Sequence, residues 1–257
     1  TPVSARNIEF VANTPLDGRG DGVQVMVHQG HAFVGHMFSD GFTVVVNFAG
    51  NVAEAESLVA RIEAAGGRAT PAQADVSDAA AVSRMFDAAQ AAFGGVDVIV
   101  NNAGIMKLAN IADAEDSLFD SQIAVNLKGS FNMLREASKR LRQGGRIINL
   151  SSSVVGLYQP TYAVYAATKA GVEAMTHVLS KELRGRNITV NAIAPGPTAT
   201  ELFFVGKPQA VIDHLTKLSP LERLGQPEDI ANAVSFLAGP DGSWINGQVL
   251  RANGGVI

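Results

Sequence analysis

The chain has 257 residues, of which 47% are hydrophobic and 17% charged, and its formal net charge is −4. A chain of this length can bury one large core, and no Pro/Gly/Ser-rich linker divides it, so we expect a single domain over residues 1–257. The acidic balance argues against nucleic-acid partners, and the lack of cysteine excludes disulfides and thiolate sites. Because neither a membrane-spanning apolar run nor a signal-peptide pattern is present, we expect no membrane partner and a cytoplasmic protein.

Short apolar strands alternate with amphipathic helices from Gly41 onward. Repeated strand–helix–strand units form α/β folds, so we expect a single-domain, Rossmann-like, doubly wound parallel sheet. In chain order, the pattern predicts a strand at residues 42–46, a helix at 53–65, a strand at 72–76, a helix at 78–93, a strand at 96–100, a helical region at 116–142, a strand at 146–150, a helix at 162–184, a strand at 188–193, helices at 209–218 and 227–238, and an edge strand at 248–250.

Four of these strands end in small or polar residues. The carboxyl ends of parallel strands meet at one edge of a sheet, which is where such folds bind their ligands. We therefore expect these strand ends to lie together in a site. They are Asp75-Val76, Asn101-Asn102-Ala103-Gly104, Ser151-Ser152-Ser153 and Pro195-Gly196-Pro197-Thr198.

Tyr165 and Lys169 lie four residues apart in a predicted helix and so share one face, while Ser152 comes from a strand end. A ketone that accepts a hydride becomes an alkoxide, which a phenol can protonate while a hydroxyl holds the oxygen. We expect the ammonium of Lys169 to bring the pKa of Tyr165 down from about 10 towards the working pH. These residues together predict ketone reduction.

Asn126 lies within Val-Asn-Leu-Lys-Gly, and a Pro-Gly-x-x-x-Thr motif ends at Thr200. In order and spacing, all these motifs resemble the short-chain dehydrogenase/reductase family, particularly the 3-oxoacyl-acyl-carrier-protein reductases, over residues 41–257. The resemblance implies an NAD(P)H-dependent oxidoreductase that transfers a hydride between nicotinamide and a ketone or secondary alcohol. It also implies that Asn126 holds a water connecting Lys169 to solvent, that Lys169 binds the cofactor ribose, and that the protein forms a homotetramer or homodimer.

The resemblance also places cofactor contacts at the strand ends, with the adenine near Asp75 and the nicotinamide carboxamide and phosphates near Thr198 and Thr200. At Asn47 the family often has an acidic residue, which disfavours the 2′-phosphate of NADP. Because this carboxylate is absent, we expect NADPH to be preferred, with NADH as the alternative. The full set of implied cofactor residues is Gly30, Asn47, Asp75, Val76, Asn102, Ala103, Gly104, Tyr165, Lys169, Pro195, Gly196, Thr198 and Thr200.

Several of these signals also have a purely structural interpretation. A Tyr-x-x-x-Lys pair alone is common on amphipathic helices, and Asn and Gly suit turns. Asp75 suits the start of a helix, and the threonines suit turn hydroxyls. The register decides which serine faces the tyrosine, and the spacing to Tyr165 selects Ser152. Tyr158 and Tyr162 have no lysine four residues later, which indicates pocket wall or packing.

The first forty residues depart from the family. Relatives have Thr-Gly-x-x-x-Gly-x-Gly there, whose glycines admit a pyrophosphate to backbone amides at a helix N-terminus. Counted back without gaps, the last glycine is Gly30, but side chains occupy the earlier positions; a second register over residues 13–20 supplies two of three glycines. Three explanations stay open: a diverged loop, a replacement that disables the site, or a reading-frame or assignment error in the recorded sequence.

Three histidines, His28, His31 and His36, lie within nine residues, but their spacing and the lack of a carboxylate motif do not predict a metal site. Residues 201–224 contain an apolar run and a predicted helix, which is typical of a mobile lid over an apolar carbonyl substrate. A basic patch for an acyl carrier is not evident. The leading hypothesis is a ketone reductase; the alternative is a cofactor-deficient homologue that serves as an assembly or binding subunit.

Overall fold

The computed structural model describes residues 33–38, 41–204 and 207–257. Its centre is a seven-stranded sheet with the order β3-β2-β1-β4-β5-β6-β7. The α/β, Rossmann-like fold class is therefore confirmed, with the carboxyl ends of β4, β5 and β6 at one edge. The strands are β1 Phe33–Phe38, β2 Gly41–Phe48, β3 Arg68–Gln73, β4 Val96–Asn101, β5 Leu141–Leu150, β6 Thr189–Pro195 and β7 Val249–Ala252.

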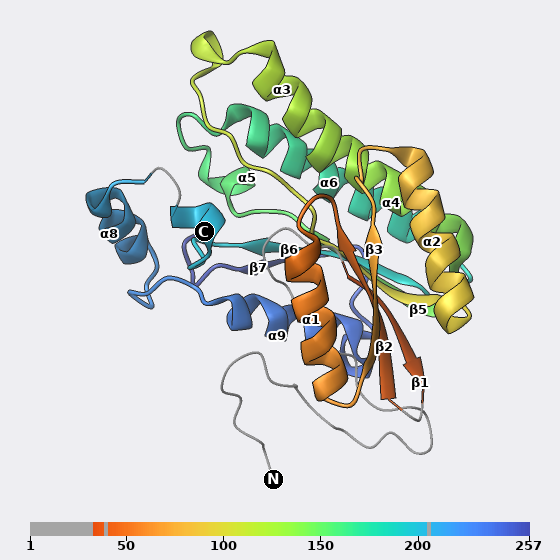
Figure 1. Ribbon diagram of the computed structural model, residues 1–257. Helices are drawn as coiled ribbons and strands as arrows, with labels where there is room; N and C mark the ends of the chain where they lie inside the picture. The colour runs from red at the N-terminus through yellow and green to blue at the C-terminus, as the bar shows by residue number, and fades with distance from the viewer. Residues whose placement is uncertain (1–32, 39–40, 205–206) are drawn as a thin grey trace.

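Helices cover both faces of the sheet (Figure 1). Helices α2, α4 and α6 contribute to one buried cluster, whereas α1 and α9 contribute to the cluster on the opposite face. None of the described helices is both long enough and apolar enough to cross a membrane. The helices are α1 Val52–Ala64, α2 Ala79–Phe93, α3 Asp116–Gln122, α4 Ser130–Arg140, α5 Val154–Leu157, α6 Ala163–Glu182, α7 Glu201–Phe204, α8 Gln209–Leu218 and α9 Pro227–Ala238, with 3-10 turns at Ile111–Asp113 and Pro240–Gly242 and a π-helical segment at Ile123–Gly129.

Strand β1 is reversed relative to the other described strands. It pairs antiparallel with both β2 and β4, so that Phe33 lies opposite Val46 and Val100, while Phe38 lies opposite Gly41. Only residues 39 and 40 separate β1 from β2, which leaves no room for a crossover helix between them. The sheet is therefore mixed rather than wholly parallel, and β1 ends at the edge remote from the carboxyl ends of β4 and β5.

Local sequence explains where the helices begin and end. The carboxylate of Asp78 accepts a hydrogen bond from the amide of Ala80 and so caps α2. Gly94 ends the same helix with a φ of 76°, a left-handed conformation that glycine adopts without steric cost. Gln226 and Asp229 form a capping box at the start of α9, and Pro227, which lies between them, is the first residue of the helix.

The third strand lies earlier than the sequence pattern predicts, because it spans Arg68–Gln73 rather than residues 72–76. It contains Pro71, which normally argues against a strand since proline cannot donate to a neighbouring strand. β3 is the last strand at its side of the sheet and pairs only with β2, where a missing donor costs little. Asp75 and Val76 consequently lie in the turn after the strand.

The helical region predicted at residues 116–142 is interrupted and ends early. A π-helical segment, Ile123–Gly129, separates α3 from α4, and α4 ends at Arg140. β5 then begins at Leu141, because a register shift allows the strand to continue through Gly144 and Gly145. A Cβ atom at Gly145 would lie 2.7 Å from the carbonyl oxygen of Asp97, so this irregular stretch requires glycine.

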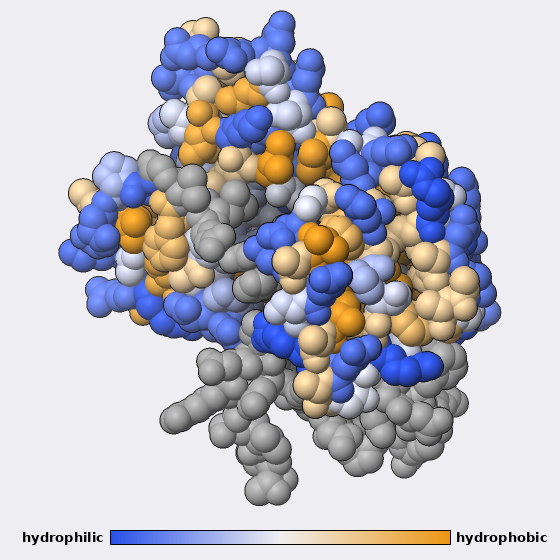
Figure 2. Space-filling model, in the orientation of Figure 1, coloured by the Kyte–Doolittle hydropathy of each residue, from blue (hydrophilic) through white to orange (hydrophobic). Residues whose placement is uncertain are grey.

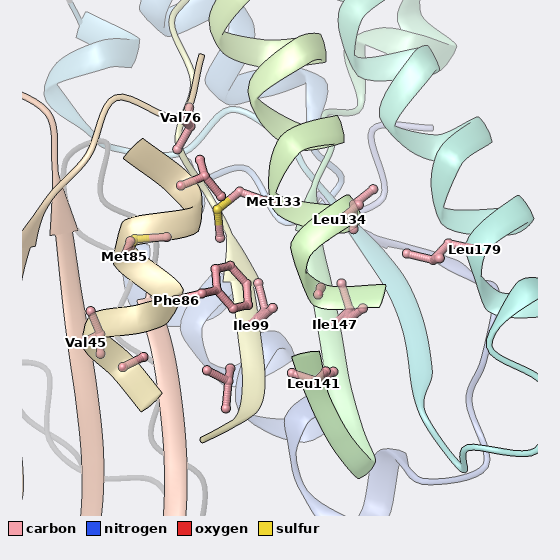
Figure 3. Close-up of a cluster of buried hydrophobic side chains, with 14 of the residues drawn as sticks. Val45, Val76, Met85, Phe86, Ile99, Met133, Leu134, Leu141, Ile147 and Leu179 are labelled. Carbon is pink, nitrogen blue, oxygen red and sulfur yellow. The ribbon is translucent and has the colours of Figure 1, made fainter. Parts of the chain in front are cut away.

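Among the residues whose burial is described, Phe86 is the largest fully buried side chain, and Figure 3 shows its ring next to Ile99 of the sheet and Met133 of α4. We expect Phe86→Ala to lower the free energy of unfolding by about 3–5 kcal/mol, because it removes apolar contacts and leaves a cavity. Phe119→Ala is the matched control, since Phe119 is 48% exposed; its effect should stay within about 0.5 kcal/mol. Urea denaturation measures both, and equal effects would contradict the expectation.

Candidate active site

The ends of β4 and β5 meet the N-terminal half of α6 and the π-helical segment. The hydroxyl of Ser152 is hydrogen-bonded to the phenol of Tyr165, and the Lys169 ammonium lies 5.7 Å from the centre of the Tyr165 ring. A Cβ atom at Gly104 would lie 3.4 Å from Asn126 Oδ1 and 3.6 Å from Lys169 Nζ. The structure thus brings these five predicted residues into one constellation.

Tyr165 differs electrostatically from the expectation. Burial raises its pKa to about 12, while the hydrogen bond with Ser152 opposes that rise and the neighbouring Tyr162 adds to it. The prediction that Lys169 brings this pKa towards neutral is therefore wrong for the structure described, because desolvation of the phenolate dominates. The phenol is protonated at neutral pH, which is the form that can donate a proton.

Lys169 is buried, and burial lowers its pKa from 10.5 to about 8. Its ammonium donates a 2.7 Å hydrogen bond to the carbonyl oxygen of Leu150, the last residue of β5. Sequence reasoning did not identify this contact, because a main-chain acceptor has no side-chain signature. This hydrogen bond connects α6 to the end of β5, next to the site.

Asn126 is fully buried in the π-helical segment, where its amide is hydrogen-bonded to the main chain of Ile105 in both directions at 2.8 Å. It also donates to Thr168 Oγ1 at 3.2 Å, and Thr168 donates to the carbonyl oxygen of Tyr165. Asn126 therefore joins the loop after β4 to α6. Thr168 belongs to this hydrogen-bond network, although the Tyr-x-x-x-Lys motif does not predict a role for it. The predicted water relay through Asn126 stays a prediction.

The three serines after β5 have different partners. Ser151 donates to Glu173 Oε1 at 2.6 Å, and Ser153 donates to the carbonyl oxygen of Ala194 at 3.1 Å. Both of these serines are buried, whereas Ser152 is partly exposed. Ser152 is thus the serine whose hydroxyl meets the phenol of Tyr165. This is the residue that the thirteen-residue spacing selects.

Tyr158 and Tyr162 flank the loop before α6. Tyr158 is 83% exposed, so it does not pack against the protein core. Tyr162 precedes α6, and burial raises its pKa as well. Tyr158 therefore does not fit the predicted packing role, whereas Tyr162 lies close enough to Tyr165 to suit a pocket wall.

The turn after β4 carries Asn102, Ala103 and Gly104. The amide of Asn102 donates to the carbonyl oxygen of Val100, and Ala103 packs against the buried cluster beneath it. The missing side chain of Gly104 leaves room beside Asn126 and Lys169. This turn has the small residues that a ribose would need for a close approach to the backbone.

Asp75 and Val76 occupy the turn between β3 and α2. The carboxylate of Asp75 accepts a hydrogen bond from the amide of Ser77, which is typical of an Asx turn, and the side chain is exposed. Val76 is buried against Gly129, where a Cβ atom would approach Val76 Cγ2 to 2.6 Å. The carboxylate of Asp75 is thus exposed beside a buried valine, and the adenine contact at these two residues stays a prediction.

Pro195 is the last residue of β6, and the segment after the strand contains Gly196, Thr198 and Thr200. A Cβ atom at Gly196 would lie 2.8 Å from the Cα atom of Asn253, so this position requires glycine. Thr198 donates to the carbonyl oxygen of Gly196 at 2.9 Å, and Thr200 accepts from the amide of Phe203. Both threonines therefore shape the turn that leads into α7, and both are partly exposed.

Asn47 does not have the environment that the sequence suggests. It is buried, and its amide donates to the carbonyl oxygens of Ala72 and Ala74 at 3.2 and 3.0 Å. Both donor hydrogens of its amide therefore bind main-chain oxygens at the end of β3, and a contact between Asn47 and the cofactor stays a prediction. Position 47 still has no carboxylate, and this absence is the basis of the expected preference for NADPH.

The described residues fit only part of a dinucleotide. The backbone at Gly104 lies next to Asn126 and Lys169, and Lys169 and Tyr165 are the residues that would hold a nicotinamide ribose. No described residue forms a glycine loop after β1, because β1 is joined to β2 through residues 39 and 40 alone and ends at the opposite edge. The predicted Gly30, the register at residues 13–20, and two of the three histidines lie outside the described residues.

Helices α7 and α8 form the segment that the sequence analysis predicts as a lid. The rings of Phe203 and Phe204 meet edge to face at 5.3 Å, and the ammonium of Lys207 lies 4.8 Å from the centre of the Phe203 ring. Only Leu215 of α8 is buried, and Figure 2 shows apolar and hydrophilic surface interspersed on this helix. The segment follows the turn at Thr198 and Thr200 and contains apolar side chains, and its role as a lid stays a prediction.

Residues 30–257 match a family model described as enoyl-(acyl carrier protein) reductase. A short-chain type dehydrogenase/reductase of Picea abies is 44% identical over 232 residues, which cover 86% of each chain. An NADPH-dependent aldehyde reductase-like protein, chloroplastic, of Arabidopsis thaliana is 42% identical, with 89% of this chain and 90% of that protein covered.

A solved short-chain dehydrogenase from Burkholderia cenocepacia, in complex with NADP, superposes with a TM-score of 0.78. It is 33% identical, and the match covers 82% of this chain and 86% of that chain. The resemblance that the motifs indicated is thereby confirmed. Because the family model and these relatives each span most of its length, the chain belongs to the short-chain dehydrogenase/reductase family.

Proposed function

We propose that the protein is an NADPH-dependent carbonyl reductase, which transfers a hydride between nicotinamide and a ketone or secondary alcohol. The observation that carries the proposal is the hydrogen bond between Ser152 and Tyr165 beside the buried ammonium of Lys169. The reduced nicotinamide supplies the hydride when it is bound. Ser152 orients the carbonyl oxygen, and Tyr165 donates the proton that this oxygen needs as the alcohol forms.

The preference for NADPH rests on two supports. Relatives include proteins named as NADPH-dependent aldehyde reductases, and a structural neighbour was solved with NADP. The chain also has Asn47, rather than a carboxylate, at the end of β2, so no like charge repels a 2′-phosphate there. Binding of NADH remains the alternative, and the ratio of the two KM values measures the preference.

The substrate class follows from the lid segment. Phe203 and Phe204 form an apolar pair in the segment that we propose covers the site, which favours an apolar carbonyl compound. The 3-oxoacyl type is one such class, and apolar aldehydes are another. A panel of aldehydes, simple ketones and 3-oxoacyl thioesters, each assayed for NADPH consumption, tests the function. NADPH bound without turnover of any member would contradict it.

The proposal predicts a pH dependence that depends on Lys169. Its pKa is lowered to about 8, so the ammonium is charged below that pH and neutral above it. Because Tyr165 stays protonated up to about pH 12, loss of the lysine charge comes first as the pH rises. We expect kcat for reduction, at saturating NADPH, to decline as the pH rises through about 8. A kcat that stays flat to pH 10 would show that this charge is not needed.

The reversed β1 favours a second candidate function, that of a cofactor-deficient homologue acting as an assembly or binding subunit. Among the described residues, no glycine loop follows β1. Calorimetric titration with NADPH and NADH separates the two functions. We expect NADPH to bind the reductase, whereas heats of dilution alone with both nucleotides would support the subunit. Intact-mass measurement and peptide mapping of residues 1–40 establish whether the recorded segment is the one present.

A homotetramer or homodimer is the assembly that we propose. Exposed apolar side chains on α4, α6 and β7 support it, including Phe131 at 48%, Val178 at 54% and Leu250 at 37% exposure. These elements are the ones through which the family resemblance predicts packing. Light scattering should give two or four times the chain mass of 26.8 kDa, and a monomer at all concentrations would reject the assembly.

A further inference from the structure

The end of β5 is bound to α6 by side chains from both elements. Asn149 donates to Thr176 Oγ1 at 2.9 Å, and the ammonium of Lys169 donates to the carbonyl oxygen of Leu150 at 2.7 Å. These residues are buried, so the bonds lie away from solvent and hold the helix at a defined height over the strand. The serines follow directly after the strand, and the helix contains Tyr165.

The next bond in this series joins Ser151 to Glu173. The hydroxyl of Ser151 donates to Glu173 Oε1 at 2.6 Å, a separation typical of a hydroxyl bound to a carboxylate. Glu173 lies four residues after Lys169 on α6 and is partly buried. Ser151 itself is the residue immediately before Ser152. Of the three bonds between the end of β5 and α6, the Ser151–Glu173 bond is therefore the nearest in sequence to Ser152.

The backbone around Ser152 is fixed on both sides. The amide of Ser151 donates to the carbonyl oxygen of Ile193 at 2.7 Å, and the amide of Ser153 donates to that of Pro195 at 2.9 Å. Those bonds place the strand end against β6, but they do not set its separation from α6. The Ser151–Glu173 bond joins this segment to α6 at the residue next to Ser152.

We propose that Glu173 is a positioning residue of the reductase site: through Ser151 it holds the Ser152 hydroxyl at hydrogen-bonding distance from Tyr165. The inference rests on the proposed function, since it assigns Glu173 a part in the same reaction. A displacement of under 1 Å between hydroxyl and phenol is enough to slow a reaction that depends on their alignment. Glu173 contacts neither reacting group directly.

The test compares Glu173→Ala with Glu173→Gln, which keeps an oxygen that can accept the Ser151 bond. We expect Glu173→Ala to lower kcat about tenfold with the KM for NADPH unchanged, and Glu173→Gln to recover most of that loss. Glu182→Ala is the matched control, because Glu182 lies on the same helix and is exposed. A glutamine variant as slow as the alanine variant would overturn the proposed hydrogen-bond role.

A double-mutant cycle distinguishes positioning from general support of the fold. In a Ser152→Ala background the hydroxyl to be positioned is gone, so Glu173→Ala should cause no further loss of kcat. An undiminished tenfold loss in that background would overturn the proposal. If the wild-type protein proves inactive with every carbonyl substrate, the proposed function fails by itself. Crystal structures of wild type and Glu173→Ala then test the geometry, and an unchanged Ser152–Tyr165 bond would refute the inference.

Discussion

Replacement of Tyr165 by Phe should lower kcat for carbonyl reduction about 100- to 10,000-fold, the range over which a positioned general acid acts. The phenol is the group that the Ser152 hydroxyl contacts, and burial keeps it protonated by raising its pKa to about 12. Phenylalanine preserves the ring and its packing on α6 but has no proton to donate. The KM for NADPH and the thermal midpoint should therefore change little.

Tyr158→Phe provides the matched control for Tyr165→Phe. Tyr158 precedes α6, whereas Tyr165 lies in its first turn. Because Tyr158 is 83% exposed, removal of its hydroxyl should leave kcat within about twofold of wild type. Both variants are assayed for NADPH consumption with the best substrate of the panel. Full turnover by Tyr165→Phe at normal cofactor affinity would exclude Tyr165 as the proton donor.

The regular helices follow directly from sequence periodicity and capping. The ranges predicted for α8 and α9 are those observed, because Pro227 marks the start of one helix and both have a clear apolar stripe. β3 was misplaced because Pro71 disguises an edge strand. The predicted strand at residues 146–150 is shorter than β5, because Gly144 and Gly145 interrupt the apolar pattern of the longer strand.

The candidate site shows the same division between local pattern and tertiary environment. The four-residue spacing of Tyr165 and Lys169 correctly predicts that they share a helix face, and it places the ammonium near the ring. Spacing contains no information about desolvation, which raises the pKa of the phenol instead of lowering it. Asn47 is a similar case, because its burial under the end of β3 depends on a strand that the pattern misplaced.

The direction of β1 could not be inferred from local sequence either. Apolar residues at positions 33–38 suit a strand of either direction, and the choice depends on the length of the connection to β2. A two-residue connection permits only a hairpin, whereas a parallel pair needs a crossover of a dozen residues or more. Among the described residues of this segment, the direction of β1 is the feature that departs from a wholly parallel sheet.

Lys169→Met should reduce kcat at least 100-fold and remove the decline above pH 8 that the wild type shows. Methionine approximates the length of lysine without its charge, so the variant tests the ammonium beside Tyr165 while filling the same buried space. Lys181→Met on the exposed surface of α6 is the control and should leave both kcat and its pH profile unchanged. A Lys169→Met enzyme that retained wild-type turnover would exclude an electrostatic role.

The same variant should differ from wild type in how its stability responds to pH. The pKa of Lys169 is depressed on folding, from 10.5 to about 8, so the folded state binds this proton more weakly than the unfolded chain. The resulting destabilisation is fully present below about pH 8 and disappears as the pH rises towards 10.5. The unfolding free energy of wild type relative to Lys169→Met should therefore increase between pH 7 and pH 10. Urea denaturation at the two pH values measures this difference, and an unchanged difference would show that burial does not penalise the ammonium.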